Sequence, residues 1–168
     1  ATLSGDTLAG NSCSHNGGGI YSRYGSLNSE QMVVTGNSSG FMGGGVYFKA
    51  DDCNISNSLM TLNEALFIGG GFYADSVSGA VNNNTFDRNS TSNGGGNVMV
   101  MTPVTGLEFK NNIVTYGSQN GVQFNNTGNL SFQYNNCYGN SPVDISSLTP
   151  DSTNISMKPY YADTASGD

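Results

Sequence analysis

The sequence predicts an all-β fold, a parallel β-helix (solenoid) of about six coils, each of about 26 residues, with three short parallel sheets. A glycine motif recurs as "GGGIY", "GGGVY" and "GGGFY", followed by the degenerate copy "GGGNVM". Three glycines favour neither a helix nor a packed strand, so their recurrence indicates a special structural need. The central glycines are evenly spaced, one in each coil, at Gly18, Gly44, Gly70 and Gly96.

A second ladder has the same period. An apolar residue recurs once in each coil, and three positions later comes an asparagine. The apolar positions are Leu8, Val34, Met60 and Phe86, and the asparagines are Asn11, Asn37, Asn63 and Asn89. Two ladders with one period predict that each coil stacks on the preceding one, about 4.8 Å away, with identical positions aligned in columns.

The elements of each coil follow from local patterning. Apolar residues alternate over four or five positions, as at Val46 and Phe48, which is the period of a strand. After Phe86 the spacing lengthens, to Val114, and then shortens, to Cys137. Another apolar ladder shifts by the same amounts, so the changes are insertions and deletions in whole coils. We therefore assign residues 1–145 to the coils and 146–168 to an irregular closing segment of the same domain.

The constant spacing gives the glycines and asparagines structural roles. Glycines at the entry to a strand permit positive φ and close approach of successive coils. Asparagines in one column are expected to form a stacked side-chain amide ladder at a bend. A narrow core of this kind also agrees with a chain of which only 36% is apolar.

Composition excludes several functions. Net charge is -7 and the five Lys and Arg residues are scattered, which argues against nucleic-acid binding. No apolar run reaches the length of a membrane span, and three cysteines and one histidine show no metal spacing, so we expect no cofactor. Sequons at Asn37 and Asn89 leave glycosylation open.

The motifs resemble those of the polymorphic outer-membrane proteins, whose passengers belong with the pectate-lyase-like β-helices. The matching pieces are the "GGGI" type and tetrapeptides such as "VTGN" and "FDRN", over residues 3 to 140. A third glycine replaces the family's alanine. The resemblance implies a right-handed β-helix, located extracellularly or on the cell surface. The tail also looks like the closing segment of secreted β-helix repeat proteins, which implies a piece of a longer protein.

The acidic residues do not predict a catalytic centre. Hydrolysis of a glycoside needs two carboxyl groups facing one sugar, whereas the twelve acids fall mostly in different columns. We therefore predict no catalytic residues. The adjacent pair Asp51 and Asp52 is expected at a turn, with a calcium site as the weaker interpretation.

One outward column stands out. Tyr21, Tyr47 and Tyr73 are expected to face outward, where their stacked rings either support the solenoid itself or form a strip for assembly or for binding a glycan or protein. If they form a binding strip, Tyr47→Ser should leave folding largely intact. The predicted function is a non-catalytic extracellular stalk, adhesin or filament-forming subunit that self-associates into fibres or binds a surface partner. The alternative is a fragment of a polysaccharide lyase or glycoside hydrolase.

Overall fold

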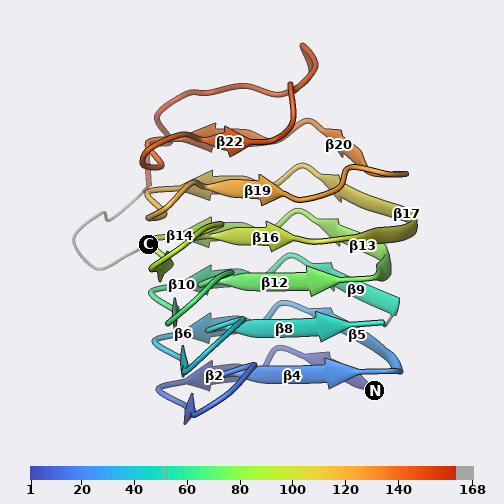
Figure 1. Ribbon diagram of the computed structural model, residues 1–168, viewed down its shortest axis with the longest axis vertical. Coiled ribbons are helices and arrows are strands. Elements are labelled where there is room, and N and C mark those ends of the chain that lie inside the picture. The colour runs from blue at the N-terminus through green and yellow to red at the C-terminus, as the bar shows by residue number, and fades with distance from the viewer. Residues whose placement is uncertain (51, 162–168) are drawn as a thin grey trace.

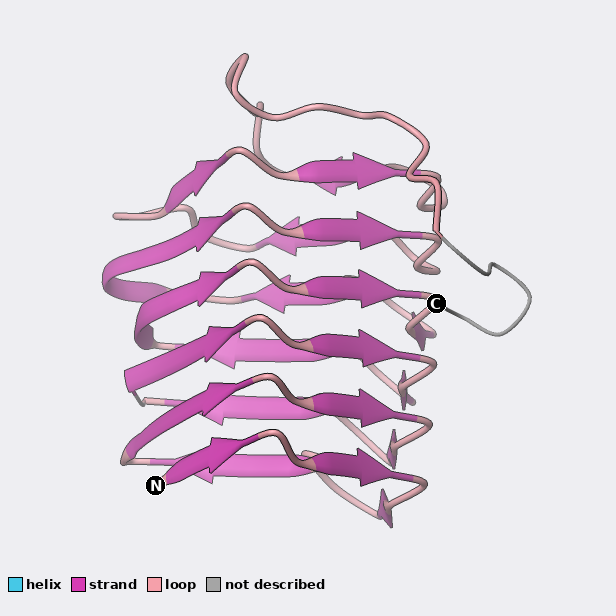
Figure 2. Ribbon diagram, turned by 180° about the vertical axis from the view of Figure 1, so that it is seen from behind, coloured by secondary structure: helices cyan, strands magenta, loops and turns pink. Residues whose placement is uncertain are grey.

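The chain winds into a parallel β-solenoid of about five turns, with its long axis vertical in Figure 1. The computed structural model describes residues 1–50 and 52–161, with the backbone alone at 103–105. The described residues form strands and turns without a helix, as Figure 2 shows. Within them, nothing meets the length and apolarity that a membrane-spanning helix requires.

Four parallel sheets run along the solenoid. Sheet A comprises β1 (Thr2–Ser4), β5 (Ser26–Glu30), β9 (Asp52–Ser56), β13 (Val77–Asn82), β17 (Pro103–Lys110) and β20 (Ser131–Gln133). Sheet B comprises β2 (Thr7–Ala9), β6 (Val33–Thr35), β10 (Leu59–Thr61), β14 (Thr85–Asp87), β18 (Ile113–Thr115) and β21 (Asn136–Tyr138). Sheet C comprises β3 (Ser12–Cys13), β7 (Ser38–Ser39), β11 (Glu64–Ala65) and β15 (Ser90–Thr91). Sheet D comprises β4 (Ile20–Arg23), β8 (Val46–Lys49), β12 (Phe72–Asp75), β16 (Val98–Val100), β19 (Val122–Phe124) and β22 (Ile145–Ser146).

The register confirms the columns expected from the repeat. In sheet B, Met60 pairs with Val34 on one side and Phe86 on the other. The shifted spacings are also correct, because Phe86 pairs with Val114 and Val114 with Cys137. Counting residues was therefore sufficient to align strands that lie far apart in the chain.

The prediction of three sheets was wrong, since sheet C is a fourth. Its strands are only two residues long, as at β7 (2 res) and β11 (2 res). Such short segments cannot show the alternation by which strands are recognised in a sequence, so the sequence does not predict strands there.

Sheet C ends where one link between strands becomes shorter. The step from Phe86 to Val114 in sheet B is longer than the step between their counterparts in sheet D, Val98 and Val122. The link from β18 to β19 is thus shorter than earlier links, and the chain passes from sheet B to sheet D without forming another strand of sheet C.

The core is a single apolar column enclosed by the sheets. Aromatic rings follow one another through it, with Phe72 and Phe86 at 6.2 Å and Phe86 and Phe109 at 5.8 Å between centroids. At the far end, Ile155 pairs with Asn136 as the closing segment folds back over the last coil. The core is thus filled by contacts between coils, since no single coil has enough apolar surface.

Candidate functional site: amide ladders, an aromatic column and a buried carboxylate

The four asparagines of the second sequence ladder form a continuous chain of amide hydrogen bonds. The Nδ2 of Asn37 donates to the Oδ1 of Asn63 over 3.0 Å, and Asn63 donates in the same way to Asn89. Each backbone N–H donates to the same oxygen, and Asn11 begins the series by donating to Asn37. Asn37, Asn63 and Asn89 are fully buried. Their amides are committed to neighbouring coils, so the sequons at Asn37 and Asn89 are inaccessible in the folded chain.

The next rung comes from an unexpected position. The ladder position after Asn89 is Gly117, and the amide is supplied instead by Asn97, whose Oδ1 accepts from Asn89 Nδ2 over 2.8 Å. Asn97 in turn donates to Asn140 and to the carbonyl of Thr115. In the coil before, the equivalent of Asn97 is Gly71, which lies against Asn89. In earlier coils the ladder position is an asparagine and the facing residue is a glycine, as for Asn89 and Gly71. In the later coil the two residue types are reversed, with Gly117 at the ladder position and Asn97 facing it.

Sequence reasoning missed a second amide ladder, at the bend between sheets A and B. Asn84 donates to Asn112, which donates to Asn135, which donates to Asn154 of the closing segment. The sequence does contain a signal for this ladder, because Asn84, Asn112 and Asn135 lie 28 and 23 residues apart. These are the same two spacings as in the apolar ladder of sheet B. The earlier positions of this column are Met32 and Ser58, which hid the pattern.

The first and second glycines of the motif have different structural roles. The first glycine has positive φ, as at Gly43 with +66°. The second needs space: a Cβ on Gly44 would lie 2.2 Å from the carbonyl oxygen of Glu64 and 2.5 Å from that of Gly70. Gly18, Gly70 and Gly96 are equally crowded by backbone atoms. The central glycines are thus required because neighbouring coils approach too closely for a Cβ atom. The glycines before them have the positive φ that favours glycine.

The tyrosine column is stacked as expected, but most of it is not exposed. Ring centroids are 5.1 Å apart between Tyr21 and Tyr47 and 5.0 Å between Tyr47 and Tyr73. Tyr21 is 51% exposed, whereas Tyr47 and Tyr73 are 5% and 4% exposed. The expectation of a solvent-facing strip was therefore wrong for Tyr47 and Tyr73.

A second apolar cluster covers these tyrosines on the outer side of sheet D. Met42 and Ile68 come from the loops that follow sheet C, and Met99 continues the column. The loop side chains fold back over the rings, which a strand pattern does not reveal. Burial raises the pKa of the Tyr73 hydroxyl above its ordinary value. The column therefore stabilises the coils, and its exposed member is Tyr21.

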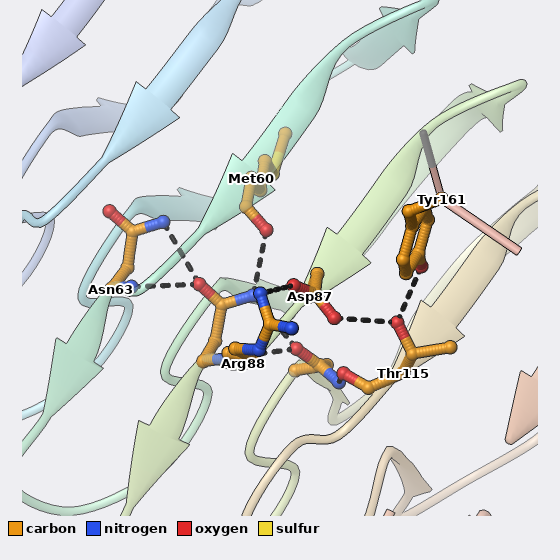
Figure 3. Close-up of polar contacts among 8 residues, drawn as sticks. Met60, Asn63, Asp87, Arg88, Thr115 and Tyr161 are labelled. Atoms are coloured by element: carbon orange, nitrogen blue, oxygen red, sulfur yellow. Dashed lines mark hydrogen bonds and ion pairs between the residues drawn. The ribbon is translucent and has the colours of Figure 1, made fainter. Parts of the chain in front are cut away.

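A buried carboxylate lies on the outer face of sheet B (Figure 3). The hydroxyl of Thr115 donates to Asp87 Oδ1 over 2.7 Å, and Arg88 Nη1 lies 3.1 Å from Asp87 Oδ2. Tyr161 lies 2.8 Å from the Thr115 hydroxyl. Because a threonine hydroxyl has one proton, donation to Asp87 makes Tyr161 the donor to Thr115. The closing segment is thereby attached to two inner coils.

The environment of Asp87 disfavours its charge. Burial raises the pKa of this carboxyl, while the bond from Thr115 and the charge of Arg88 act in the opposite direction. The neighbouring hydroxyl of Thr61 is also buried, with no hydrogen-bond partner among the described residues. The partners of Asp87 are the Thr115 hydroxyl and the Arg88 guanidinium, whereas hydrolysis of a glycoside needs a second carboxylate facing the same sugar.

The remaining candidates do not converge. Asp51 lies outside the described residues, and Asp52 Oδ1 accepts from the Ser78 hydroxyl of the next coil. Over residues 1–50 and 52–161, no three potential metal-binding side chains come together. Cys53 and Cys137 are buried, and burial raises the pKa of Cys137 to about 12, which keeps it a thiol.

A furrow of about 380 Å³ runs along the outer face of sheet A. Asn54 donates across it to Asn28 over 3.0 Å, and Glu30 accepts from Ser4 over 3.2 Å. Of the described side chains lining this furrow, Glu30 alone carries a charge. It has the hydrogen-bonding groups for a sugar and a single carboxylate.

Comparisons of the chain with protein-family models, with curated proteins and with solved structures found no match. The structure shows the parallel β-solenoid implied by the resemblance to polymorphic outer-membrane proteins.

Proposed function

We propose that the chain is a non-catalytic structural segment of an extracellular or cell-surface protein, used as a stalk, adhesin or filament subunit. One observation carries the proposal: the buried asparagine side chains are bonded to one another from coil to coil. The ladder from Asn37 through Asn63 to Asn89 is the clearest case. Such groups give axial continuity, whereas catalysis needs groups that converge on a substrate.

Stacked aromatic groups support the same conclusion. Tyr47 and Tyr73 lie face to face outside the lumen, and Phe86 and Phe109 are stacked within it. Buried and satisfied amide networks make a structure rigid, and stacked rings add contact between neighbouring coils. A solenoid with these columns is suited to holding two ends of a longer protein at a set distance.

The test is a turnover assay on the folded chain. Neutral and uronate-containing polysaccharides are incubated with the protein, and new reducing ends and unsaturated products are measured. We expect no release above a heat-denatured sample. Release that disappears in Glu30→Gln or Asp87→Asn would overturn the proposal and locate the reacting carboxyl.

The furrow on sheet A favours the second candidate, a polysaccharide-acting protein. Its amides at Asn28 and Asn54 and its carboxylate at Glu30 fit sugar hydroxyls. A glycosidase needs two carboxyl groups about 5 to 9.5 Å apart, whereas the described lining of the furrow contains a single carboxyl group, that of Glu30. Binding of a glycan without turnover, lost in Asn54→Ala, would support an adhesin over a stalk.

A further inference from the structure

Exposed apolar side chains gather on one coil, around β11. Leu62, Leu66 and Phe67 are all exposed, and the ring of Phe67 stacks on exposed Phe41 at 5.1 Å. Adjacent coils carry small or polar residues at two of these positions: Gly36 and Arg88 align with Leu62, and Gly40 and Ser92 with Leu66. We call Leu62, Glu64, Leu66, Phe67 and Phe41 the acidic apolar patch.

Folding does not explain the leucine at position 62. Its backbone has a φ of +57°, in a turn where the same column has Gly10, Gly36 and Gly139, and where Arg88 and Tyr116 also have a positive φ of 51°. Side chains other than glycine and asparagine are disfavoured in this conformation, and an exposed leucine gains nothing from burial. Leu62 therefore combines a disfavoured backbone conformation with an exposed apolar side chain in the isolated chain, which indicates a role in contact with a partner.

A carboxylate stands within this apolar surface. Glu64 projects from β11 between Leu62 and Leu66 and is exposed. Within the described part of the chain, the ion pairs are Lys49 with Asp75, Arg88 with Asp87 and Lys110 with Glu108. Glu64 belongs to none of them, so the patch suits an apolar partner that also brings a cation.

The same chain carries a surface of that kind. Tyr21, Arg23 and Tyr24 are exposed on β4 and the turn after it, and we call them the basic aromatic patch. The guanidinium of Arg23 lies 4.5 Å from the centroid of the Tyr24 ring and donates to its hydroxyl over 2.7 Å. Tyr24 also has a positive φ, of 60°, and is 69% exposed.

Charge accounting supports Arg23 as the available cation. The chain has five Lys and Arg residues. Three of them form the ion pairs just given, so Arg23 and Lys158 are the ones without a carboxylate partner in the described part of the chain. Of these two, Arg23 is held against an aromatic ring.

We propose that the acidic apolar patch of one copy binds the basic aromatic patch of the next, with Glu64 paired to Arg23. This names the partner within the proposed structural function and rests on it. In Figure 1, sheets B and D meet on the left through the turns that contain sheet C, while β4, β8 and β12 point right toward sheet A. Arg23 and Tyr24, at the end of β4, thus lie at the edge of the solenoid opposite the acidic apolar patch. A contact between different surfaces extends from copy to copy as an open side-by-side array when its rotation does not close a ring.

Sedimentation velocity over a concentration series, with negative-stain electron microscopy, tests the pairing. The native chain is expected to form reversible oligomers and laterally packed rods. Glu64→Arg and Arg23→Glu should each raise the concentration needed for association at least about tenfold, because like charges then face each other. Combining both changes in one chain should restore association.

Matched controls separate charge, folding and contact. Asp6→Arg and Lys158→Glu make the same charge changes at exposed sites elsewhere and should leave association unchanged. Leu62→Gly restores the residue of the neighbouring coil, so it should keep or raise the midpoint of thermal unfolding while weakening association. A native chain that stays monomeric at every concentration, or native oligomers indifferent to both charge reversals, would overturn the pairing. Neither result involves polysaccharide turnover, which is the outcome that overturns the structural function itself.

Discussion

At the scale of single residues, the polar side chains of this protein act along the solenoid axis. An amide side chain has donors and an acceptor, so it can pass hydrogen bonds from coil to coil without leaving a buried group unpaired. Asn97 shows how strict this requirement is. Where Gly117 interrupts the ladder, Asn97 reaches in from the opposite side, between Asn89 and Asn140.

The reversal of asparagine and glycine predicts a rescue by double substitution. Asn97→Gly should lower the free energy of unfolding by about 2 kcal/mol or more, because it leaves buried partners unsatisfied at Asn89 and Asn140. Adding Gly117→Asn, which restores the arrangement of earlier coils, should recover much of the loss. Urea unfolding of the two single variants and the double variant measures the coupling. Additive losses would show that the two positions do not share one rung.

Asp87 predicts a change in the pH dependence of stability. Since its pKa is raised in the folded state, the unfolded chain loses this proton first as pH rises above about 4, and the free energy of unfolding falls until the folded pKa is passed. Asp87→Asn removes that contribution. The stability of the variant relative to the native chain should therefore increase as the pH rises above about 4, until the raised pKa of the folded state is passed. Urea unfolding at several pH values checks this, and a difference independent of pH would contradict it.

At the scale of strands and loops, the path of a loop decides which side chains are exposed. Tyr47 and Tyr73 point away from the lumen, as alternation requires, yet loop residues such as Met42 and Ile68 cover them. The outer face of sheet D therefore carries a second apolar layer. Tyr21 escapes it because it stands at the first coil of the column.

This arrangement reverses the expected effect of Tyr47→Ser. Loss of a buried ring between two stacked neighbours should lower the free energy of unfolding by about 3 kcal/mol, in the range for removal of large core side chains. Tyr21→Ser, on the exposed member of the same column, should cost less than about 1 kcal/mol. Thermal unfolding of both variants provides the comparison. Equal and small losses would restore the interpretation of a solvent-facing strip.

At the scale of the whole molecule, stability is shared between neighbouring coils. The inward residues of the first coil, such as Leu3, Leu8 and Ile20, are half-buried, whereas Met60 and Phe86 are fully buried with coils on both sides. In a solenoid each coil is stabilised mainly by the two beside it. Opening is therefore expected to depend on position along the axis.

Hydrogen exchange should show this gradient. Backbone amides of β10, β12 and β14 are expected to exchange most slowly, and those of β1 to β4 fastest, since local opening needs fewer contacts to break there. Mass spectrometry of peptides from the exchanged chain resolves the coils. Uniform protection from the first coil onward would indicate all-or-none opening and contradict nearest-neighbour stabilisation.

The sequence by itself determined the repeat, the register and the inward columns. These depend on counting, because parallel strands in successive coils align identical positions. The regular spacing up to Phe86 and the two altered spacings after it predicted the pairs that end at Cys137. The second amide ladder, through Asn84 and Asn112, followed the same rule but began with Met32 and Ser58, so its period was not recognised.

The tertiary structure alone decided which outward and non-repeating residues are covered. Burial of Tyr47 depends on loops that fold back, the role of Asn97 on a shortened link, and burial of Asp87 on contacts between coils and the closing segment. A repeat specifies what recurs in every coil. Features present in one coil depend on the path of the chain in three dimensions, and they include both Asp87 and the patch around Glu64.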